Sequence, residues 1–531
     1  MLSVLEFLER LASRRAGAIL LFTVALGVYA VESIGWPLVG GRDLDEYLYG
    51  YIQFLDWHPL LPWSMLFRTP ATPIVTGVAL DVAHGFFAEP LMGVLFAGSV
   101  VAWAAAARAY SPRAALVVGA ALLVYPAYGL FFHELSSDAL FGAAFALWAW
   151  LLVRAVSQPS ARRFALAGAA VALCALVRPG NAVLLLFAAF ALLLAGASRD
   201  RVRWAAAFLV AGLLPLVAWS LLNGARFGYY GLARGGNAVI PFYRAFITDK
   251  IVAPQNGPAS RRLAAAVQHH LLTRDPYKSY HVTLHDVFSS GSFRIHEDLY
   301  LLSDEVFGWG TDYSVLRDAG IEAVGRHPGT YASGVGETVW EQLSKSYFRI
   351  PPAPNGAPGP VSTPQPRLPK PTEGQPIPGG QDVWISTPHN SIREVWTSPT
   401  QHHYVFRSPR DRARFDRIIR ESDELFAALP DRRGNSELRL RLNQASRWYP
   451  RLILWIAIGV LALAIRRPRG ARTLLAISVA ALVVILLNAL GLFADPRFVL
   501  PVAPAFVLLA AAALLGPRGT AAASPQDRAP R

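Results

Sequence analysis

The sequence predicts a mainly α-helical, polytopic membrane protein with about ten transmembrane helices, and three observations support this fold class. Hydrophobic residues make up 53% of the 531 residues and charged residues only 16%, whereas soluble domains carry roughly 25% charged residues. The mean hydropathy is +0.33. Long apolar runs recur along the chain, separated by short segments that contain arginine. An ordinary cytosolic enzyme, a disordered chain and a collagen are excluded, and the single cysteine, Cys174, excludes an intrachain disulfide.

Ten runs approach the roughly 20 mostly apolar residues that a membrane-spanning helix needs. They lie near 16–35, 88–107, 114–132, 136–153, 164–177, 180–197, 204–222, 450–465, 473–493 and 498–516. The first run could also be a signal peptide cleaved after Val28-Tyr29-Ala30, but its apolar character continues to Val39 and favours an uncleaved anchor. The run at 72–87 carries Asp81 and His84, so we expect an interfacial or re-entrant helix there.

The distribution of arginines predicts the orientation. If the N-terminus is cytoplasmic, eighteen arginines fall in inside segments, whereas the short outside segments hold only Arg42, Arg68, Arg178 and Arg497. Membrane insertion therefore explains the net charge of +14 better than nucleic-acid binding does. We expect a multi-pass cell-membrane protein with both termini in the cytoplasm and its large loop outside.

Three domains follow from this topology. Residues 1–222 form an N-terminal transmembrane module of seven spans, residues 223–448 an extracytoplasmic segment, and residues 449–531 a C-terminal module of three spans with a short cytoplasmic tail. The segment between spans seven and eight contains no membrane-length apolar run, so we expect α+β or irregular soluble structure. Within it, residues 351–380 hold eleven prolines and five glycines and predict an extended linker. Helical spacing at 409–447 predicts an amphipathic helix on the soluble domain or the membrane surface.

Ionisable residues gather in four turns that this topology places on one outer face. The turns carry Asp43, Asp45 and Glu46; Glu134 and Asp138; Arg178; and Asp495 with Arg497. Carboxylates at such a face can act as a general base or bind a metal, and outer arginines suit bidentate binding of phosphate. The combination fits transfer from a membrane-embedded phosphate donor, in which a base deprotonates an acceptor hydroxyl and the arginines stabilise the leaving phosphate.

Each of these residues also has a purely structural interpretation. The acids of the first outer loop could cap the helix that follows, and Asp138 could be an N-terminal helix charge. Arg178 could belong to a turn signal, and Arg497 could pair only with Asp495. Their joint occurrence on one face favours a common site over these separate interpretations.

Five motifs occur in order along the two transmembrane modules. They are Asp45-Glu46 with Tyr49; Arg68-Thr69-Pro70-Ala71-Thr72-Pro73; Ser136-Ser137-Asp138; Leu176-Val177-Arg178-Pro179-Gly180; and Arg497-Phe498-Val499-Leu500-Pro501 with Pro504. In order and membrane side they resemble the GT-C class of membrane glycosyltransferases, specifically the broad family that includes protein O-mannosyltransferases and the aminoarabinose transferase acting on lipid A. The resemblance covers residues 1–222 and 450–516.

The resemblance implies a sugar donor linked to a polyprenyl phosphate and an active site at the outer face. It places Asp45 at the family's catalytic acidic position as the base, with Glu46 beside it, and Asp138 at the second acidic position. For substrate binding we add Arg178 and Arg497 as phosphate contacts, with Arg68, Asp43 and Glu134 as further candidates. No cofactor is assigned; a divalent metal ion could assist, with ligands unknown. The long outer segment departs from the simplest members of the family, and we expect it to bind the acceptor.

The leading hypothesis is therefore an integral-membrane glycosyltransferase of cell-envelope biogenesis. It would move a sugar from a polyprenyl-phosphate donor to a hydroxyl of an extracytoplasmic glycan, lipid or protein. One alternative is a transporter or flippase of a lipid-linked sugar, which predicts mid-membrane charges and internal symmetry that the sequence lacks. Another is a cell-envelope binding protein, which leaves the outer acids and arginines unexplained. The Ala- and Arg-rich composition, with only four lysines, favours a bacterial source.

Overall fold

The structure is a computed structural model of the chain. It describes residues 14–193, 198–345 apart from 275, 276 and 279, 382–384, 392–398 and 401–518, with a few residues before position 14. The predicted linker at 351–380 and the last residues of the predicted cytoplasmic tail lie outside the described residues.

A helix forms at each of the ten predicted apolar runs. In chain order these helices are α2 (Arg15–Gly35), α6 (Ala88–Arg108), α7 (Pro112–Leu123) with α8 (Pro126–Leu130), α9 (Ser137–Ser157), α10 (Ala161–Val177), η2 (Pro179–Phe187) with α11 (Ala188–Leu192), α12 (Ser198–Phe227), α21 (Leu452–Arg466), α22 (Ala471–Gly491) and α23 (Pro504–Leu515). Serine N-caps begin two of them, because Ser111 and Ser160 accept hydrogen bonds from backbone N–H groups of the first turn.

Fewer than ten of these helices are long enough to cross a membrane by themselves. Within the described part of the chain, six segments are long and apolar enough, or seven if α7 and the bent segment after it count as one span. One of the six, Ser436–Arg466, combines the amphipathic α20 (Ser436–Trp448) with the apolar α21. The multi-span helical fold is confirmed, whereas the count of ten is not.

Proline accounts for two of the short helices. The chain bends by 68° between α7 and the segment that begins at Pro126, and it forms 3-10 turns from Pro179 onward. Proline lacks a backbone N–H and restricts the residue before it, so a continuous apolar run is broken into two helices at these points.

The first outer loop contains short elements. They are β1 (Val39–Gly40), α3 (Leu44–Ile52), α4 (Pro62–Leu66) and α5 (Ala71–Asp81); the second outer turn contributes η1 (Phe131–His133) and β2 (Glu134–Leu135). The polar run at 72–87 thus forms a helix over most of its length, and the position of this helix relative to the bilayer stays a prediction.

The outer segment, which comprises residues 223–448 and which we predict to lie outside the membrane, is mainly helical with one small sheet. Its elements are α13 (Gly236–Ala238), η3 (Val239–Thr248), η4 (Pro254–Asn256), α14 (Pro258–Ala266), η5 (Val267–Leu271), α15 (Leu284–Ser290), α16 (Phe293–Phe307), η6 (Trp309–Thr311), α17 (Ser314–Arg326), α18 (Pro328–Ser344), β3 (Asp382–Trp384), β4 (Ile392–Ser398), β5 (Gln401–Phe406), α19 (Pro409–Ala427) and α20. The strands form an antiparallel sheet in the order β3-β4-β5. The amphipathic stretch predicted at 409–447 is two helices, α19 and α20.

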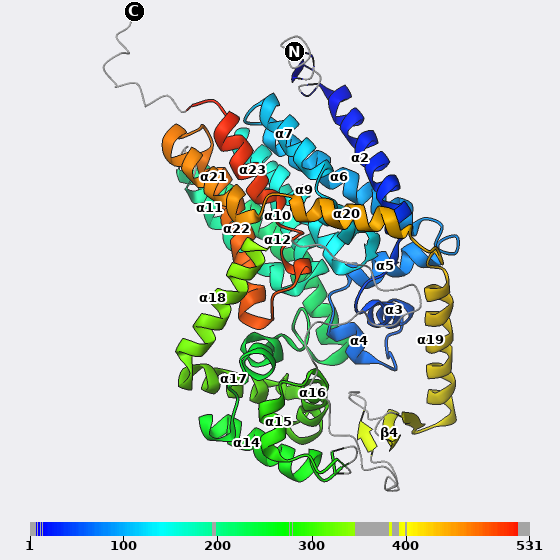
Figure 1. The fold of residues 1–531 in the computed structure, drawn as a ribbon. Helices are drawn as coiled ribbons and strands as arrows, with labels where there is room; N and C mark the ends of the chain where they lie inside the picture. The colour runs from blue at the N-terminus through cyan, green and yellow to red at the C-terminus, as the bar shows by residue number, and fades with distance from the viewer. Residues whose placement is uncertain are drawn as a thin grey trace, which may run out of the picture.

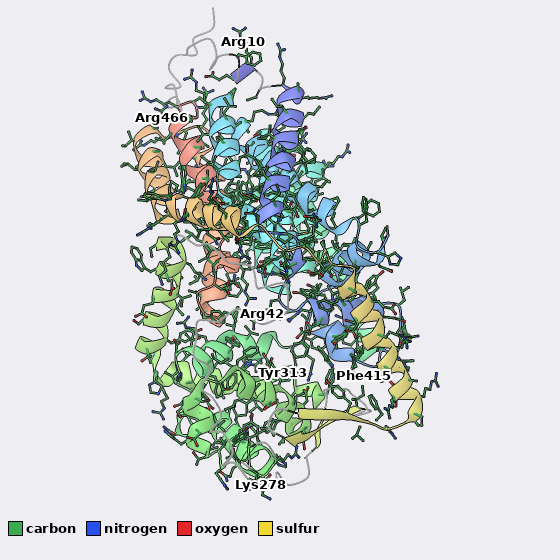
Figure 2. The ribbon with its side chains drawn as sticks, turned by 45° about the vertical axis from the view of Figure 1, so that its right-hand side comes forward. Arg10, Arg42, Lys278, Tyr313, Phe415 and Arg466 are labelled. Carbon is green, nitrogen blue, oxygen red and sulfur yellow. The ribbon has the colours of Figure 1, made fainter. Side chains whose placement is uncertain are left out.

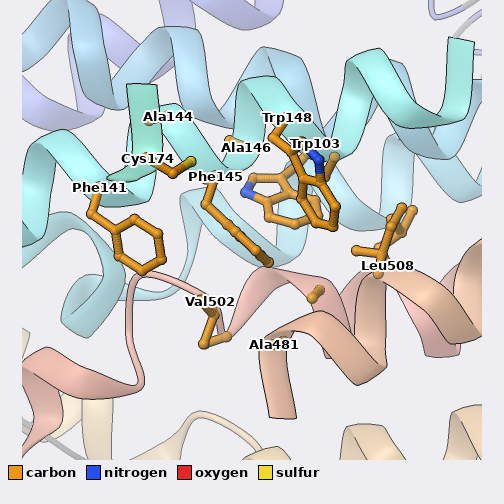
Figure 3. Packing of buried hydrophobic residues seen from close by; sticks show 14 of the residues in the cluster. Trp103, Phe141, Ala144, Phe145, Ala146, Trp148, Cys174, Ala481, Val502 and Leu508 are labelled. Carbon is orange, nitrogen blue, oxygen red and sulfur yellow. The ribbon is translucent and has the colours of Figure 1, made fainter. Parts of the chain in front are cut away.

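The membrane helices share one hydrophobic core. Figure 3 shows large aromatic side chains within it, and the ring of Phe145 lies 5.2 Å from that of Trp148 and 6.0 Å from that of Trp103. Small residues bring the helices together elsewhere: a Cβ added at Gly168 of α10 would lie 2.0 Å from the carbonyl oxygen of Phe208 on α12. Such close approach of backbones is typical of helix packing in membranes.

A second core lies in the outer segment and includes one residue of α22. Phe242, Leu263, Leu299 and Leu316 are buried together with Ala489. Because Ala489 belongs to a membrane helix, the outer segment packs directly on the end of that helix.

The arrangement of the helices places the outer segment at one end of the molecule. In Figure 1, α7, α21 and α23 lie toward the upper end, α14, α15 and α17 lie at the lower end, and α20 runs across the helices between them. Figure 2 shows Arg10 and Arg466 near one end, Lys278 at the opposite end and Arg42 between them. Arg42 therefore marks the level at which the membrane helices and the outer segment meet.

The predicted topology can be tested with two introduced cysteines. Cysteine at Thr311, in the outer segment, should react with a membrane-impermeant maleimide from outside intact cells, and cysteine at Pro468 should react only after the membrane is permeabilised. The native Cys174 is buried and should react in neither case, which makes the parent protein the control. Labelling of both positions from outside would contradict the assigned orientation.

Candidate functional site

A short parallel pairing of β1 with β2 joins the first outer loop to the second outer turn. Val39 pairs with Glu134 and Gly40 with Leu135, and the Gly41 N–H donates to the Leu135 carbonyl at 3.2 Å. A Cβ at Gly41 would lie 2.5 Å from the Ser136 Cβ, so this approach requires glycine. The loop that follows carries the first acids, and the turn that follows carries Ser137 and Asp138.

The acids of the first outer loop contact two arginines. Arg68 Nη2 lies 2.6 Å from Glu46 Oε2 and 3.2 Å from Asp43 Oδ2, and Arg42 Nε lies 3.6 Å from Asp43 Oδ1. Burial alone would lower the pKa of Arg68, but Glu46 and Asp43 outweigh burial and raise it. Burial also raises the pKa of Glu46, and the nearby Arg68 offsets only part of this rise.

A second arginine and acid pair forms between the start of α9 and the end of α10. Arg178 Nη2 lies 2.5 Å from Asp138 Oδ1, and Arg178 Nε donates to Ser137 Oγ at 3.0 Å. Asp138 is 6% exposed. Pro179 and Gly180 end α10 and turn the chain there, which holds Arg178 in an extended conformation at the helix end.

Tyr47 joins these two clusters. Its ring lies 5.8 Å from Arg68 Cζ, and Ser137 acts to lower the pKa of its hydroxyl. Burial raises the pKa of Tyr47, and Arg68 and Arg178 both act to lower it. Tyr47 therefore lies within the electrostatic influence of both Arg68 and Arg178.

Arg497 brings the last outer turn to the same place. Its Nε lies 3.4 Å from Asp495 Oδ2, and its side chain is 14% exposed. Burial would lower the pKa of Arg497, but four carboxylates outweigh it and raise the pKa. These carboxylates belong to Asp495, Asp138, Asp43 and Glu134. Residues from three outer turns thus act electrostatically on one guanidinium.

Asp45 lies apart from this cluster, although it is adjacent in sequence to Glu46. Asp45 is exposed, and among the residues that the structure describes it forms no ion pair or hydrogen bond. Successive residues of an α-helix point about 100° apart, so Asp45 and Glu46 of α3 face different directions. Burial and the charge of Asp45 raise the pKa of Tyr49, one helical turn further on, to about 12.

The outer segment supplies an aromatic wall beside the arginines. Arg42 Cζ lies 5.4 Å from the Phe293 ring, and the Tyr243 ring lies 6.3 Å from Phe293 and 6.4 Å from Phe493. Burial raises the pKa of Tyr243, whereas Arg42 and Arg497 act to lower it. The aromatic wall therefore extends from Arg42 in the first outer loop to Arg497 in the last outer turn.

The structure thus connects most of the predicted site residues. Asp43, Glu46, Arg68, Glu134, Asp138, Arg178 and Arg497 are linked by ion pairs, hydrogen bonds or electrostatic contact, and Asp45 lies on the neighbouring face of α3. Among the described residues, no group of three or more His, Cys, Asp or Glu side chains could hold a metal ion. The described site residues are arginines and carboxylates.

Several residues near the site were missed by the sequence reasoning. Tyr47 and Tyr243 carry no charge, so a search for misplaced charges passes over them. Glu32 could have been found as an acid at the end of the first span: it is 3% exposed, and its Oε2 lies 3.6 Å from Nε2 of the buried His133. The ring of Tyr29 stacks on that of His133, with the ring centroids 4.2 Å apart.

This architecture defines a polytopic membrane protein with a partly buried cluster of arginines and carboxylates at one end of its helices. A family model described as dolichyl-phosphate-mannose-protein mannosyltransferase matches residues 82–222, about a quarter of the chain. The match confirms the predicted resemblance to GT-C membrane glycosyltransferases over this part of the sequence and indicates a glycosyltransferase. No curated protein matches the chain.

Two solved proteins show distant similarity over most of the chain. ArnT from Cupriavidus metallidurans, bound to undecaprenyl phosphate, is 13% identical with a TM-score of 0.32, and the match covers 94% of this chain and 77% of ArnT. The archaeal oligosaccharyltransferase AglB from Archaeoglobus fulgidus, in complex with an inhibitory peptide and a dolichol-phosphate, is 12% identical with a TM-score of 0.30. That match covers 95% of this chain and 57% of AglB.

Proposed function

We propose that this protein is an integral-membrane glycosyltransferase that moves a sugar from a polyprenyl-phosphate donor to a hydroxyl of an extracytoplasmic acceptor. The observation that carries the proposal is the meeting of Arg68, Arg178 and Arg497, from separate outer turns, with a shared set of carboxylates. The family match over residues 82–222 supports the reaction class.

The arginines retain donors that a phosphate could use. Within the described residues, the buried Nε atom of Arg68 has no hydrogen-bond partner, and that of Arg497 faces only Asp495 Oδ2 at 3.4 Å, without forming a hydrogen bond. A guanidinium offers five N–H donors and matches the oxygens of a phosphate in a bidentate manner. An unused donor in a desolvated place is costly, so binding a phosphate oxygen there would remove that cost.

The reaction that fits this site is a displacement at the anomeric carbon of the donor sugar. The acceptor oxygen forms a bond to that carbon, the bond from the carbon to the phosphate oxygen breaks, and polyprenyl phosphate leaves with the electron pair. The acceptor proton passes to a carboxylate. Arg178 and Arg497 stabilise the negative charge that develops on the leaving phosphate, which is the electrostatic role expected of preorganised cations.

Asp45 is the carboxylate best suited to accept the proton. Asp43, Glu46 and Asp138 each have a carboxylate oxygen occupied by an arginine, which leaves them less accessible to the hydroxyl of an acceptor. Asp45 is exposed and unpaired within the described residues, so an acceptor hydroxyl arriving from outside could reach it. The outer segment, which forms one wall of the site through Tyr243 and Phe293, is where we place acceptor binding.

The reaction can be tested with purified protein in liposomes and a panel of radiolabelled lipid-linked sugars. The proposal predicts a new glycosidic product with release of polyprenyl phosphate when membrane lipids, cell-wall glycan or secreted protein are supplied as acceptors. Movement of labelled lipid between leaflets with no new glycosidic bond would show a transporter instead. Binding of an envelope component without either event would show a binding protein.

The raised pKa of Glu46 predicts that the plot of kcat/KM against pH has an acid limb, a loss of activity at low pH. The proposal requires the ionised carboxylate of Glu46 to hold Arg68. We therefore expect kcat/KM to fall as the pH drops through the pKa of Glu46. Because this pKa is raised, the fall should occur at a higher pH than for an ordinary glutamate. Glu46→Gln cannot ionise, so its kcat/KM should be lower and should lose this limb. The matched control is Glu305→Gln, whose parent residue pairs with Arg274 in the outer segment. An unchanged acid limb in Glu46→Gln would assign it to another group.

A further inference from the structure

Arg244 is a buried arginine that joins the outer segment to the end of a membrane helix. It lies in η3 and is 1% exposed. Its Nε and Nη2 donate to Asp249 Oδ2 and Oδ1 at 2.9 and 3.0 Å. Its Nη1 donates to Thr338 Oγ1 at 3.0 Å and to the carbonyls of Ala489 and Leu492 at 2.9 and 3.0 Å.

These carbonyls belong to the C-terminal end of α22. The last carbonyls of an α-helix have no partner within the helix, and a cation there is favourable because it opposes the helix dipole. Arg244 supplies both hydrogen-bond donors for these carbonyls and a positive charge at the helix end. Asp249 binds its guanidinium from the other side. The Tyr331 hydroxyl donates to the Leu490 carbonyl at 2.5 Å, so the outer segment makes three hydrogen bonds to this helix end.

The helix end leads directly to the last outer turn. Phe493 follows Leu492, and its ring lies 6.4 Å from Tyr243 and 6.3 Å from Phe498. Asp495 Oδ1 then accepts from the Arg497 N–H at 3.0 Å, and its Oδ2 pairs with the Arg497 side chain. Arg497 therefore lies in the turn that directly follows the end of α22.

We infer that Arg244 is a positioning residue for the transfer reaction: by binding the last carbonyls of α22, it fixes the turn that presents Arg497 to the donor phosphate. The inference rests on the proposed function. It gives the outer segment a role in completing the donor site in addition to acceptor binding.

A double-mutant cycle tests the inference. Arg244→Lys keeps the positive charge but cannot make the forked contacts. We expect kcat/KM for the donor to fall about 10-fold when this change is made in the parent protein. In an Arg497→Lys background the fall should be less than about 2-fold, because the effects of coupled residues are non-additive. The loss should appear mainly in kcat. The same cost in both backgrounds would overturn the inference, because it would show that Arg244 acts independently of Arg497.

Tyr331→Phe provides a second variant if Arg244→Lys folds poorly. It removes one hydrogen bond to the same helix end, and its smaller loss of kcat/KM should also disappear in the Arg497→Lys background. Arg274→Lys is the matched control, because Arg274 pairs with Glu305 in the outer segment, and this variant should keep full activity. A loss of activity in Arg274→Lys would indicate that weakening any ion pair of the outer segment lowers activity.

Amide hydrogen exchange supplies a measurement that does not depend on activity. Exchange in residues 492–498 should be faster in Arg244→Lys than in the parent protein, with no change at the start of α22. Unchanged exchange there would contradict the positioning role even if activity fell. A parent protein that transfers no sugar would refute the proposed function, and the exchange result would still stand as a separate test of the contact.

Discussion

Asp45→Asn is expected to lower kcat for sugar transfer by about 10²–10⁴-fold, the range that general base catalysis contributes. Asparagine has nearly the same shape as aspartate but cannot accept a proton from the acceptor hydroxyl. Asp45 forms no ion pair within the described residues, so the change should disturb neither the fold nor the arginine cluster. Donor binding, measured with labelled polyprenyl-phosphate sugar in the absence of acceptor, should be unchanged.

The matched control for this variant is Asp56→Asn. Asp56 lies in the same outer loop, but its Oδ2 pairs with Arg414 of α19 at 2.7 Å, away from the arginine cluster. Activity close to that of the parent protein is expected. Full transfer activity in Asp45→Asn would remove Asp45 as the base and leave the arginine-held carboxylates as candidates.

Arg497→Ala should reduce kcat/KM for the donor by about 10²–10³-fold, comparable to removing one preorganised donor from a site that stabilises a developing anion. The guanidinium lies near the carboxylates of Asp495, Asp138 and Asp43. Its removal would leave Asp495 without its paired cation, whereas Asp138 and Asp43 would keep Arg178 and Arg68. Both the affinity for the donor and kcat should fall, because the phosphate gains negative charge as it leaves.

Arg317→Ala serves as the control for Arg497→Ala, because Arg317 is a partly exposed arginine of the outer segment that pairs with Asp318. Arg497→Lys should recover part of the donor affinity, since it restores the charge without the planar fork. Equal kcat/KM values for Arg497→Ala and the parent protein would exclude Arg497 from the donor site.

The membrane character and the outer-face charges could be predicted from the sequence because both follow from the cost of burying polar groups in a bilayer. Helices form at all ten apolar runs, and Arg68, Arg178 and Arg497 were recognised because they oppose the bias of the insertion rule. Hydropathy does not reveal how long each helix is. Pro179–Leu192 and Pro504–Leu515, for example, are shorter apolar helices, and the count of ten spans is not confirmed.

The pairing within the site could not be predicted, because it depends on contacts between distant segments. Arg178 pairs with Asp138, 40 residues earlier, and Arg244 bonds to the carbonyl of Ala489, 245 residues later. The adjacent pair Asp45-Glu46 illustrates the same limit at short range. The sequence alone does not indicate which of these two carboxylates faces Arg68. In the structure the direction of α3 places Glu46 beside Arg68.

A structure of the protein with polyprenyl phosphate bound would test the central claim most directly. We expect the phosphate oxygens within about 3 Å of guanidinium nitrogens of Arg178 and Arg497, with the lipid chain running along the membrane helices. A phosphate bound elsewhere, with both arginines still held only by Asp138 and Asp495, would contradict the assignment of this cluster as the donor site.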